Sequence, residues 1–369
     1  MSAEPQGSHE REAGGEHQGA AAAPWVPERE VPPELVRRLL VAQFTGRFDA
    51  DAPLADLGVG WDNRAYLATD REGAEWVLRL PRRAVGAELM EVELAVLPLV
   101  ASALADAALA VPDPTLVGRP SGDYPWPFGG YRALPGATAC SVTVPASVRA
   151  AGAATLGKFL GRLHGLGADE RVQAVAPQDT IGRTAQPKRL GQLLERLDAL
   201  VDPESPGAPA GRPGARPAAG GELSVSVGVF PGGLTVEPRE VRARAIELAE
   251  AAPWSAGTPR LQHGDLYARH LLVDGVGLPA GLIDWGDTHL GDPAMDLSIA
   301  WSFLAGEARA DLVAAYERSF GVGVDQATRD RARFRALFYG VVLVQYGRDV
   351  ADERIERVGH EALERGLAD

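Results

Sequence analysis

Two acidic residues and a histidine, Asp265, His270 and Asp284, have the types and spacing that could perform chemistry. They lie in the stretch LQHGDLYARHLLVDGVGLPAGLIDWGDTHLGDPAMD. Within it, short apolar strands over 270–274 and 281–284 flank a turn rich in Gly and Pro, a pattern that predicts a β-hairpin.

Hairpin symmetry is expected to bring the three side chains together. The centre falls near Gly277, so His270 and Asp284 should lie side by side at the open end. Asp265 precedes His270 in the loop that feeds the first strand. Two carboxylates cannot lie together away from water without a counter-charge. A divalent cation held by Asp284 and His270 would supply that charge and leave Asp265 free as a base.

Other polar residues of this stretch are interpreted as structural. His263 is expected to brace the loop, and Asp292 and Asp296 to cap or tether the helix that follows. Asp287 stays open between a metal or substrate contact and a solvated turn. A metal-dependent hydrolase built on His263, Asp265 and His270 is a further hypothesis, although its spacing lacks a confident third ligand.

The order of motifs resembles the aminoglycoside phosphotransferase family of kinase-like enzymes. The sequence reads His263-Gly264-Asp265, then His270 where Asn is usual, then Asp284-Trp285-Gly286, followed by GDPAMDL. The resemblance implies an α+β, two-lobed protein-kinase-like fold, with a small antiparallel-sheet N-lobe and a larger, mostly helical C-lobe. It also implies Asp265 as catalytic base, and Mg²⁺, with Mn²⁺ as the alternative, on Asp284 and His270.

The first half of the chain offers the residues that such a fold uses for the nucleotide. The Gly-rich turn before the strand 64–69 would bind phosphates through Gly58, Gly60 and Asn63. In WVLRLPRR, Arg79 stands where the family places a phosphate-pairing Lys. The ion-pair partner chosen for Arg79 is Glu93, with Glu88 and Glu91 as rivals. PFGGYRALPG, which contains Tyr131, resembles the hinge that contacts the nucleotide base.

The function implied is transfer of the γ-phosphoryl group of ATP or GTP to a hydroxyl of a small polar or sugar-bearing acceptor. Aminoglycoside and macrolide antibiotics are candidate acceptors. WVLRLPRR, His270 and the run GLIDW are most similar to macrolide phosphotransferases, which use GTP readily. Because His270 replaces Asn and Arg79 replaces Lys, a catalytically impaired kinase-like nucleotide- or ligand-binding protein remains the alternative.

The elements that position these residues follow from hydrophobic periodicity. Helices are expected over 33–44, 87–105, 148–166, 189–200, 239–252, 294–304, 308–320 and 330–346, and strands over 64–69 and 76–80 around Gly73. The expected organisation is a disordered tail (1–28), an N-lobe (29–128) and a C-lobe (129–369) with a flexible insertion (203–221). His164 is expected to be a satisfied core histidine.

Composition excludes several classes of function. The 369 residues carry a formal net charge of −13, which argues against a nucleic-acid binder or a basic membrane-surface protein. One cysteine, Cys140, permits neither an internal disulfide nor a cysteine-based metal site. Neither a targeting segment nor a membrane span is evident, so a cytoplasmic protein is expected. The sequence does not set its oligomeric state.

Overall fold

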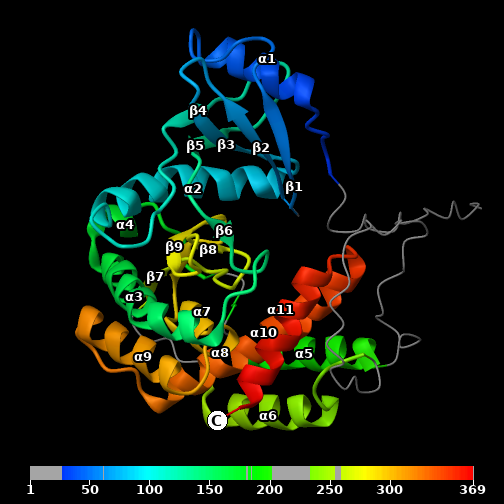
Figure 1. The fold of residues 1–369 in the computed structure, drawn as a ribbon, viewed down its shortest axis with the longest axis vertical. Coiled ribbons are helices and arrows are strands. Elements are labelled where there is room, and N and C mark those ends of the chain that lie inside the picture. The colour runs from blue at the N-terminus through cyan, green and yellow to red at the C-terminus, as the bar shows by residue number, and fades with distance from the viewer. Residues whose placement is uncertain are drawn as a thin grey trace, which may run out of the picture.

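The chain folds into two lobes of different composition. The computed structural model describes residues 27–60, 62–179, 182–183, 185–201, 233–253 and 259–368. Figure 1 shows a sheet with two helices at the top and a larger, mainly helical lobe below. The insertion expected over 203–221, and all but the last two residues of the expected tail, lie outside the described residues.

The N-lobe is a five-stranded antiparallel sheet in the order β1-β2-β3-β5-β4. Tyr66 of β2, Leu78 of β3 and Phe128 of β5 are fully buried. They belong to the hydrophobic core that the sheet shares with the first helix. The second helix lies on the other side of the sheet and joins the core of the C-lobe. The elements are α1 (Pro33–Gln43), β1 (Leu54–Val59), β2 (Asn63–Thr69), β3 (Glu75–Pro81), α2 (Ala84–Ala103), β4 (Leu116–Gly118) and β5 (Phe128–Arg132).

The sheet also sets where one lobe ends. All of β5 pairs within the N-lobe sheet, with Trp76 of β3 opposite Arg132. We therefore divide the lobes after Arg132 rather than after residue 128.

The C-lobe surrounds two small sheets with helices. One sheet has the order β6-β8-β9 and the other pairs β10 with β7. The elements are β6 (Ala137–Thr138), α3 (Ala146–Gly165), a 3₁₀ turn (Leu166–Ala168), α4 (Glu170–Gln173), α5 (Gln186–Val201), α6 (Pro238–Ala251), β7 (Arg260–Gln262), β8 (Leu271–Val273), β9 (Pro279–Leu282), β10 (His289–Gly291), α7 (Ala294–Leu297), α8 (Ile299–Ser302), α9 (Glu307–Phe320), α10 (Gln326–Asp349) and α11 (Glu353–Leu367).

Two glycines let α3 and α9 touch along their backbones. A Cβ atom at Gly157 would lie 2.1 Å from the carbonyl oxygen of Leu312. One at Gly161 would lie 2.8 Å from the carbonyl oxygen of Tyr316. Any side chain at either position would force the two helices apart.

Most expected helices are confirmed within a few residues, but one expected helix differs and several elements, among them α4, β6, β7 and β10, were not expected. The helix expected over 294–304 is two short helices, α7 and α8. The Ser298 hydroxyl between them donates to the carbonyl of Met295, which competes with the helical ladder. The strand β1 and the helix α11 were not expected. None of the described helices is both long and apolar enough to cross a bilayer.

Candidate active site

The hairpin that carries the predicted residues forms as expected. Leu271 of β8 pairs with Leu282 of β9, and the amide of Ile283 donates to the carbonyl of His270 at 3.0 Å. Gly277 lies in the turn with φ of 94°, a conformation that favours glycine. His270 and Asp284 therefore meet at the open end of the hairpin.

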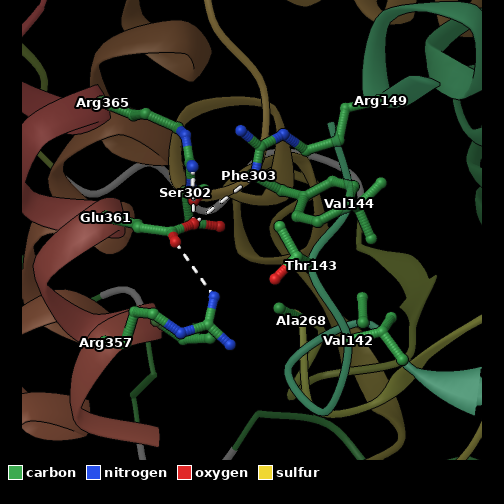
Figure 2. Close-up of a pocket in the computed structure, with 12 residues that line it drawn as sticks. Val142, Thr143, Val144, Arg149, Ala268, Ser302, Phe303, Arg357, Glu361 and Arg365 are labelled. Atoms are coloured by element: carbon green, nitrogen blue, oxygen red, sulfur yellow. Dashed lines mark hydrogen bonds and ion pairs between the residues drawn. The ribbon is translucent and has the colours of Figure 1, made fainter. Parts of the chain in front are cut away.

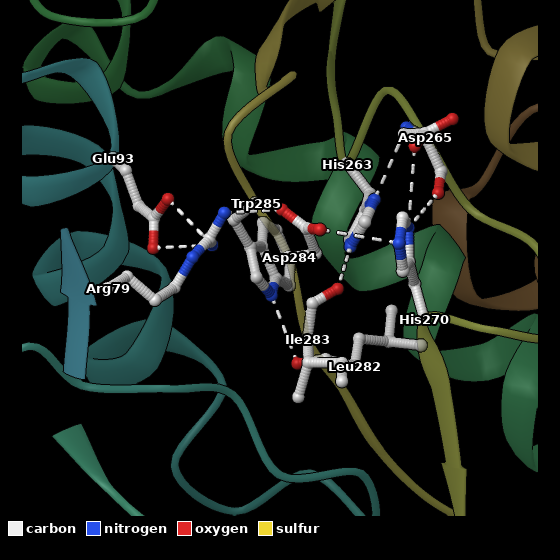
Figure 3. Close-up of polar contacts among 9 residues, drawn as sticks. All are labelled: Arg79, Glu93, His263, Asp265, His270, Leu282, Ile283, Asp284 and Trp285. Atoms are coloured by element: carbon white, nitrogen blue, oxygen red, sulfur yellow. Dashed lines mark hydrogen bonds and ion pairs between the residues drawn. The ribbon is translucent and has the colours of Figure 1, made fainter. Parts of the chain in front are cut away.

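The two carboxylates and the imidazole converge, as the sequence predicts (Figure 3). His270 Nδ1 lies 2.7 Å from the main-chain oxygen of Asp265 and 3.5 Å from its carboxylate oxygen Oδ2. His270 Nε2 lies 3.4 Å from Oδ2 of Asp284. The histidine thus links the catalytic loop, residues 263–270, to the end of β9.

Arg79 brings positive charge to this cluster from the other lobe. Its Nη2 lies 2.5 Å from Oδ1 of Asp284, and its Nη1 lies 2.9 and 2.8 Å from the two carboxylate oxygens of Glu93. Glu93 is therefore the partner on α2, as expected, and its rivals Glu88 and Glu91 are not. The direct contact between Arg79 and Asp284 was not expected.

Burial and charge act in opposite directions on Asp284. Burial raises the pKa of this carboxyl, but the charges of Arg79 and His270 outweigh burial and hold the pKa well below its usual range. The carboxylate therefore stays ionised throughout the physiological pH range. For Glu93, burial dominates and raises the pKa despite Arg79.

Asp296 fixes the catalytic loop to the C-lobe core. Its two carboxylate oxygens accept the main-chain amides of His263, at 2.7 Å, and Gly264, at 2.9 Å. His164 on α3 contacts the same carboxylate at 3.2 Å and Tyr316 at 2.9 Å. The tethering role expected of Asp296 and the core role expected of His164 are both confirmed.

His263 braces the loop as a neutral imidazole. Its Nδ1 accepts the amide of Asp265, so its Nε2 donates to the carbonyl of Ile283 at 3.0 Å. Complete burial lowers the pKa of His263 to about 4. The residue therefore positions Asp265 and the end of β9 without transferring protons at neutral pH.

A tyrosine that sequence reasoning missed holds the predicted base. Tyr339 on α10 donates its hydroxyl to Oδ1 of Asp265 at 2.7 Å. Arg335 lies over the Tyr339 ring, with its guanidinium carbon 4.1 Å from the ring centroid. Burial raises the pKa of Asp265, while His270 and the Tyr339 hydrogen bond act against that rise. No local pattern marked Tyr339, which lies 74 residues away within an expected helix.

The Gly-rich turn lies between β1 and β2, but two of its amides already have acceptors. The Gly58 amide donates to the Asp56 carboxylate at 3.0 Å, and the Gly60 amide donates to the Asn63 carbonyl at 2.8 Å. The buried Asn63 Oδ1 has no hydrogen-bond partner among the described residues. Phosphate binding by this turn therefore stays a prediction that requires the Gly58 amide to change partner.

Two more predicted residues lie near this cluster. Tyr131 is on β5 and its side chain is buried. Burial raises the pKa of Tyr131, and the charge of Arg79 acts against that rise. Its contact with a nucleotide base stays a prediction. Asp287 forms an ion pair with Arg183 at 2.5 Å, so it is not a simple solvated turn.

The geometry of His270 and Asp284 fits a divalent cation. His270 Nδ1 lies beside the Asp265 carbonyl, and its Nε2 faces Oδ2 of Asp284. These two atoms are 3.4 Å apart, a spacing that suits two ligands of one ion when Nε2 carries no proton. No group of three or more metal-ligating side chains occurs within the described ranges. A cation here would take its remaining ligands from phosphate and water, and a hydrolase metal site lacks its third protein ligand.

The matched family agrees with this geometry. The model of the Phosphotransferase enzyme family matches residues 54–337, which include both lobes and every residue of the cluster. The chain belongs to this family. The fold expected from the sequence resemblance is thereby confirmed.

Solved structures of family enzymes share the fold over most of their length. The GDP and kanamycin complex of APH(2″)-IIIa has a TM-score of 0.58 and 21% identity, covering 90% of this chain and 97% of that one. The macrolide 2′-phosphotransferase MphH from Brachybacterium faecium has a TM-score of 0.52 and 23% identity, covering 90% and 98%. The uncharacterized protein YcbJ of Bacillus subtilis is 34% identical over 65 residues, which span 18% of this chain and only 21% of that relative.

Proposed function

We propose that this phosphotransferase-family protein transfers the γ-phosphoryl group of ATP or GTP to a hydroxyl of a small polar or sugar-bearing acceptor. The observation that supports it most is the continuous chain of contacts from Glu93 and Arg79 through Asp284 and His270 to Asp265. This chain of contacts supports a cation-binding pair, Asp284 and His270, beside the partly exposed carboxylate of Asp265, at the junction of the two lobes that we call the cleft.

The reaction assigns each group a task. The acceptor oxygen forms a bond to the γ-phosphorus while the bond from that phosphorus to the β–γ bridging oxygen breaks, and the nucleoside diphosphate leaves with that electron pair. Asp265 orients the acceptor hydroxyl and takes its proton. Tyr339 occupies Oδ1 of Asp265, which leaves Oδ2 as the oxygen for this proton.

The groups across the cleft act on the nucleotide. Arg79 reaches the triphosphate as a positively charged fork held by Glu93. Asp284 and His270 would hold Mg²⁺ or Mn²⁺, which supplies charge neutralisation for the phosphates. Burial of Arg79, Glu93 and His270 strengthens the electrostatic interactions that they make.

The acceptor class is the finer part of the proposal. MphH acts, by its name, on macrolides, and the complex of APH(2″)-IIIa contains kanamycin. An antibiotic hydroxyl of either class is the candidate that we propose to test first, with antibiotic resistance as the corresponding role.

The experiment is a coupled assay of nucleoside diphosphate release. Aminoglycosides, macrolides and alcohol-bearing metabolites are screened with ATP and GTP in parallel, in Mg²⁺ and in Mn²⁺. We expect acceptor-dependent turnover that Asp265→Asn reduces by at least about 10³-fold with unchanged thermal stability. Asp274→Asn, at the exposed turn of the same hairpin, is the matched control.

The same proteins test the alternative that the chain binds nucleotide without catalysis. The 2.5 Å ion pair between Arg79 and Asp284 favours this alternative, because the pair occupies a carboxylate oxygen that a cation would need. A binding protein would show nucleotide-induced thermal stabilisation but no turnover with any acceptor. Full turnover by Asp265→Asn would remove the proposed base.

A further inference from the structure

A second polar cluster lies behind the catalytic loop, in a cavity of about 110 Å³. We call it the arginine pocket and define it by Arg149 of α3, Ser302 of α8, and Arg357, Glu361 and Arg365 of α11. Figure 2 shows the three guanidinium groups arranged around the Glu361 carboxylate. None of the lining residues belongs to the N-lobe or to the cluster of Asp265, His270 and Asp284.

Charge in this pocket is unbalanced. Glu361 contacts Arg365 at 2.6 Å, Arg357 at 3.2 Å and Arg149 at 3.5 Å, so one carboxylate serves three cations. No other charged side chain lines the cavity among the described residues. In a protein whose net charge is −13, this local excess of positive charge is unusual.

The donors of the pocket outnumber its acceptors. Each guanidinium group has five N–H donors. Arg365 and Arg357 each also reach one carbonyl, those of Ser302 at 2.9 Å and Cys140 at 3.0 Å. Among the described residues, Arg149 has only the long contact to Glu361, apart from lying over the Phe303 ring. Burial and the neighbouring Arg365 lower the pKa of Arg149, as expected for a cation short of acceptors.

An unpartnered hydroxyl points to a ligand independently of the charges. Ser302 lines the cavity and is only 7% exposed. Its Oγ has no hydrogen-bond partner among the described residues. A buried hydroxyl without a partner costs free energy, and a bound acceptor in the cavity would remove that cost.

We propose that the arginine pocket binds a phosphate-type oxyanion, either inorganic phosphate or the phosphoryl group of a small phosphomonoester. Forked guanidinium groups match the oxygens of such an anion, and a serine hydroxyl adds a neutral donor. The cavity has room for a tetrahedral oxyanion.

The pocket adjoins the catalytic loop. Ala268 of that loop lines the cavity, and its carbonyl accepts the amide of Cys140 at 3.2 Å. Arg357 in turn donates to the carbonyl of Cys140. An oxyanion held by Arg357 therefore stabilises the loop at Ala268 through Cys140.

The test is thermal unfolding and calorimetric titration of the full chain with inorganic phosphate and, separately, glycerol 3-phosphate. Sodium chloride at equal ionic strength controls for screening. We expect a saturable rise in Tm of about 3 °C with at least one of the two probes. The probe that binds more tightly identifies the source of the oxyanion.

Two variants separate a ligand site from a purely structural cluster. Ser302→Ala removes an unpartnered hydroxyl, so it should leave Tm without phosphate unchanged or higher while weakening phosphate binding at least tenfold. Arg149→Gln should also weaken binding at least tenfold. Arg162→Gln, at the exposed end of α3, should bind phosphate like the natural protein.

Three results would overturn the proposal. The first is that neither probe gives a saturable response, and the second is that the response survives in Ser302→Ala and Arg149→Gln. The third is that Ser302→Ala has a lower Tm than the natural protein without phosphate. None of these results bears on phosphoryl transfer in the cleft, so the two proposals fail separately.

Discussion

The cleft and the arginine pocket have opposite charge balances. In the cleft, Arg79 faces the carboxylates of Glu93 and Asp284, with Asp265 beyond His270. In the arginine pocket, Glu361 faces three arginines. Each cluster is incomplete by itself, and each calls for a ligand of the opposite sign: a cation in the cleft and an anion in the pocket. Counting the charges that face each other therefore indicates ligand chemistry better than the net charge of the chain does.

The largest expected effect comes from removing Asp284, the carboxylate that we propose as a cation ligand. Asp284→Asn should lower kcat/KM by about 10³-fold and abolish the Mg²⁺-dependent part of nucleotide-induced stabilisation. Steady-state kinetics and thermal unfolding with and without Mg²⁺ measure both quantities. Asp274→Asn on the same hairpin is the control, and a Mg²⁺ response that survives in Asp284→Asn would contradict the assignment.

Removing one arginine from each cluster tests the comparison directly. Arg79→Met leaves Glu93 buried without a partner, so it should lower the free energy of unfolding by about 3–5 kcal/mol. Arg149→Met, in the pocket with excess arginine, should cost about 1 kcal/mol or less. Urea denaturation gives both values.

A compensating change sharpens this result. Adding Glu93→Leu to Arg79→Met should recover most of the loss, because no buried charge then lacks a partner. Equal losses for the two single variants would show that the charge balance does not distinguish the clusters.

The pH dependence of stability tests the role of His263, which braces the catalytic loop. The pKa of His263 is lowered to about 4 in the folded chain, against about 6.5 when unfolded. Between these two pKa values, His263 therefore binds a proton in the unfolded state but not in the folded state. Stability is fully present above pH 6.5 and falls by on the order of 3 kcal/mol as the pH drops toward 4. In His263→Gln, the free energy of unfolding, measured by denaturation across that pH range, should fall by correspondingly less. A fall as large as that of the natural protein would exclude this role of His263.

The smallest effect is expected from the residue that positions the base. Tyr339→Phe should lower kcat/KM by about tenfold, the value of one hydrogen bond to a charged group. Loss of that bond also raises the pKa of Asp265, so the acid limb of the pH–rate profile should move to higher pH. Tyr124→Phe, which removes a buried hydroxyl from the N-lobe, should leave the profile in place.

Local patterns were sufficient to predict the geometry of the hairpin. The period of its strands and the glycine turn predicted the pairing to within one residue, since Ile283 rather than Asp284 bonds to the His270 carbonyl, and the side chains of His270 and Asp284 still meet. Glu93, on the helix that follows β3, was likewise chosen over Glu88 and Glu91, and the structure pairs it with Arg79. In both cases the partners belong to adjacent elements.

Contacts between distant segments could not be predicted in the same way. Arg79 and Asp284 are 205 residues apart, and nothing near either residue indicates that they meet. Tyr339 approaches Asp265 only because α10 packs against the catalytic loop. The helix α11 is a different case: Ile355, Val358 and Ala362 recur at helical spacing, so its pattern was present in the sequence.

The close contact of α3 with α9 has a consequence for directed evolution of this protein. Helix α3 carries Arg149 near its start and His164, which holds Asp296, near its end. A library that randomises the whole gene and selects for a new acceptor should still return glycine at positions 157 and 161, since any larger residue would shift both ends of this helix together.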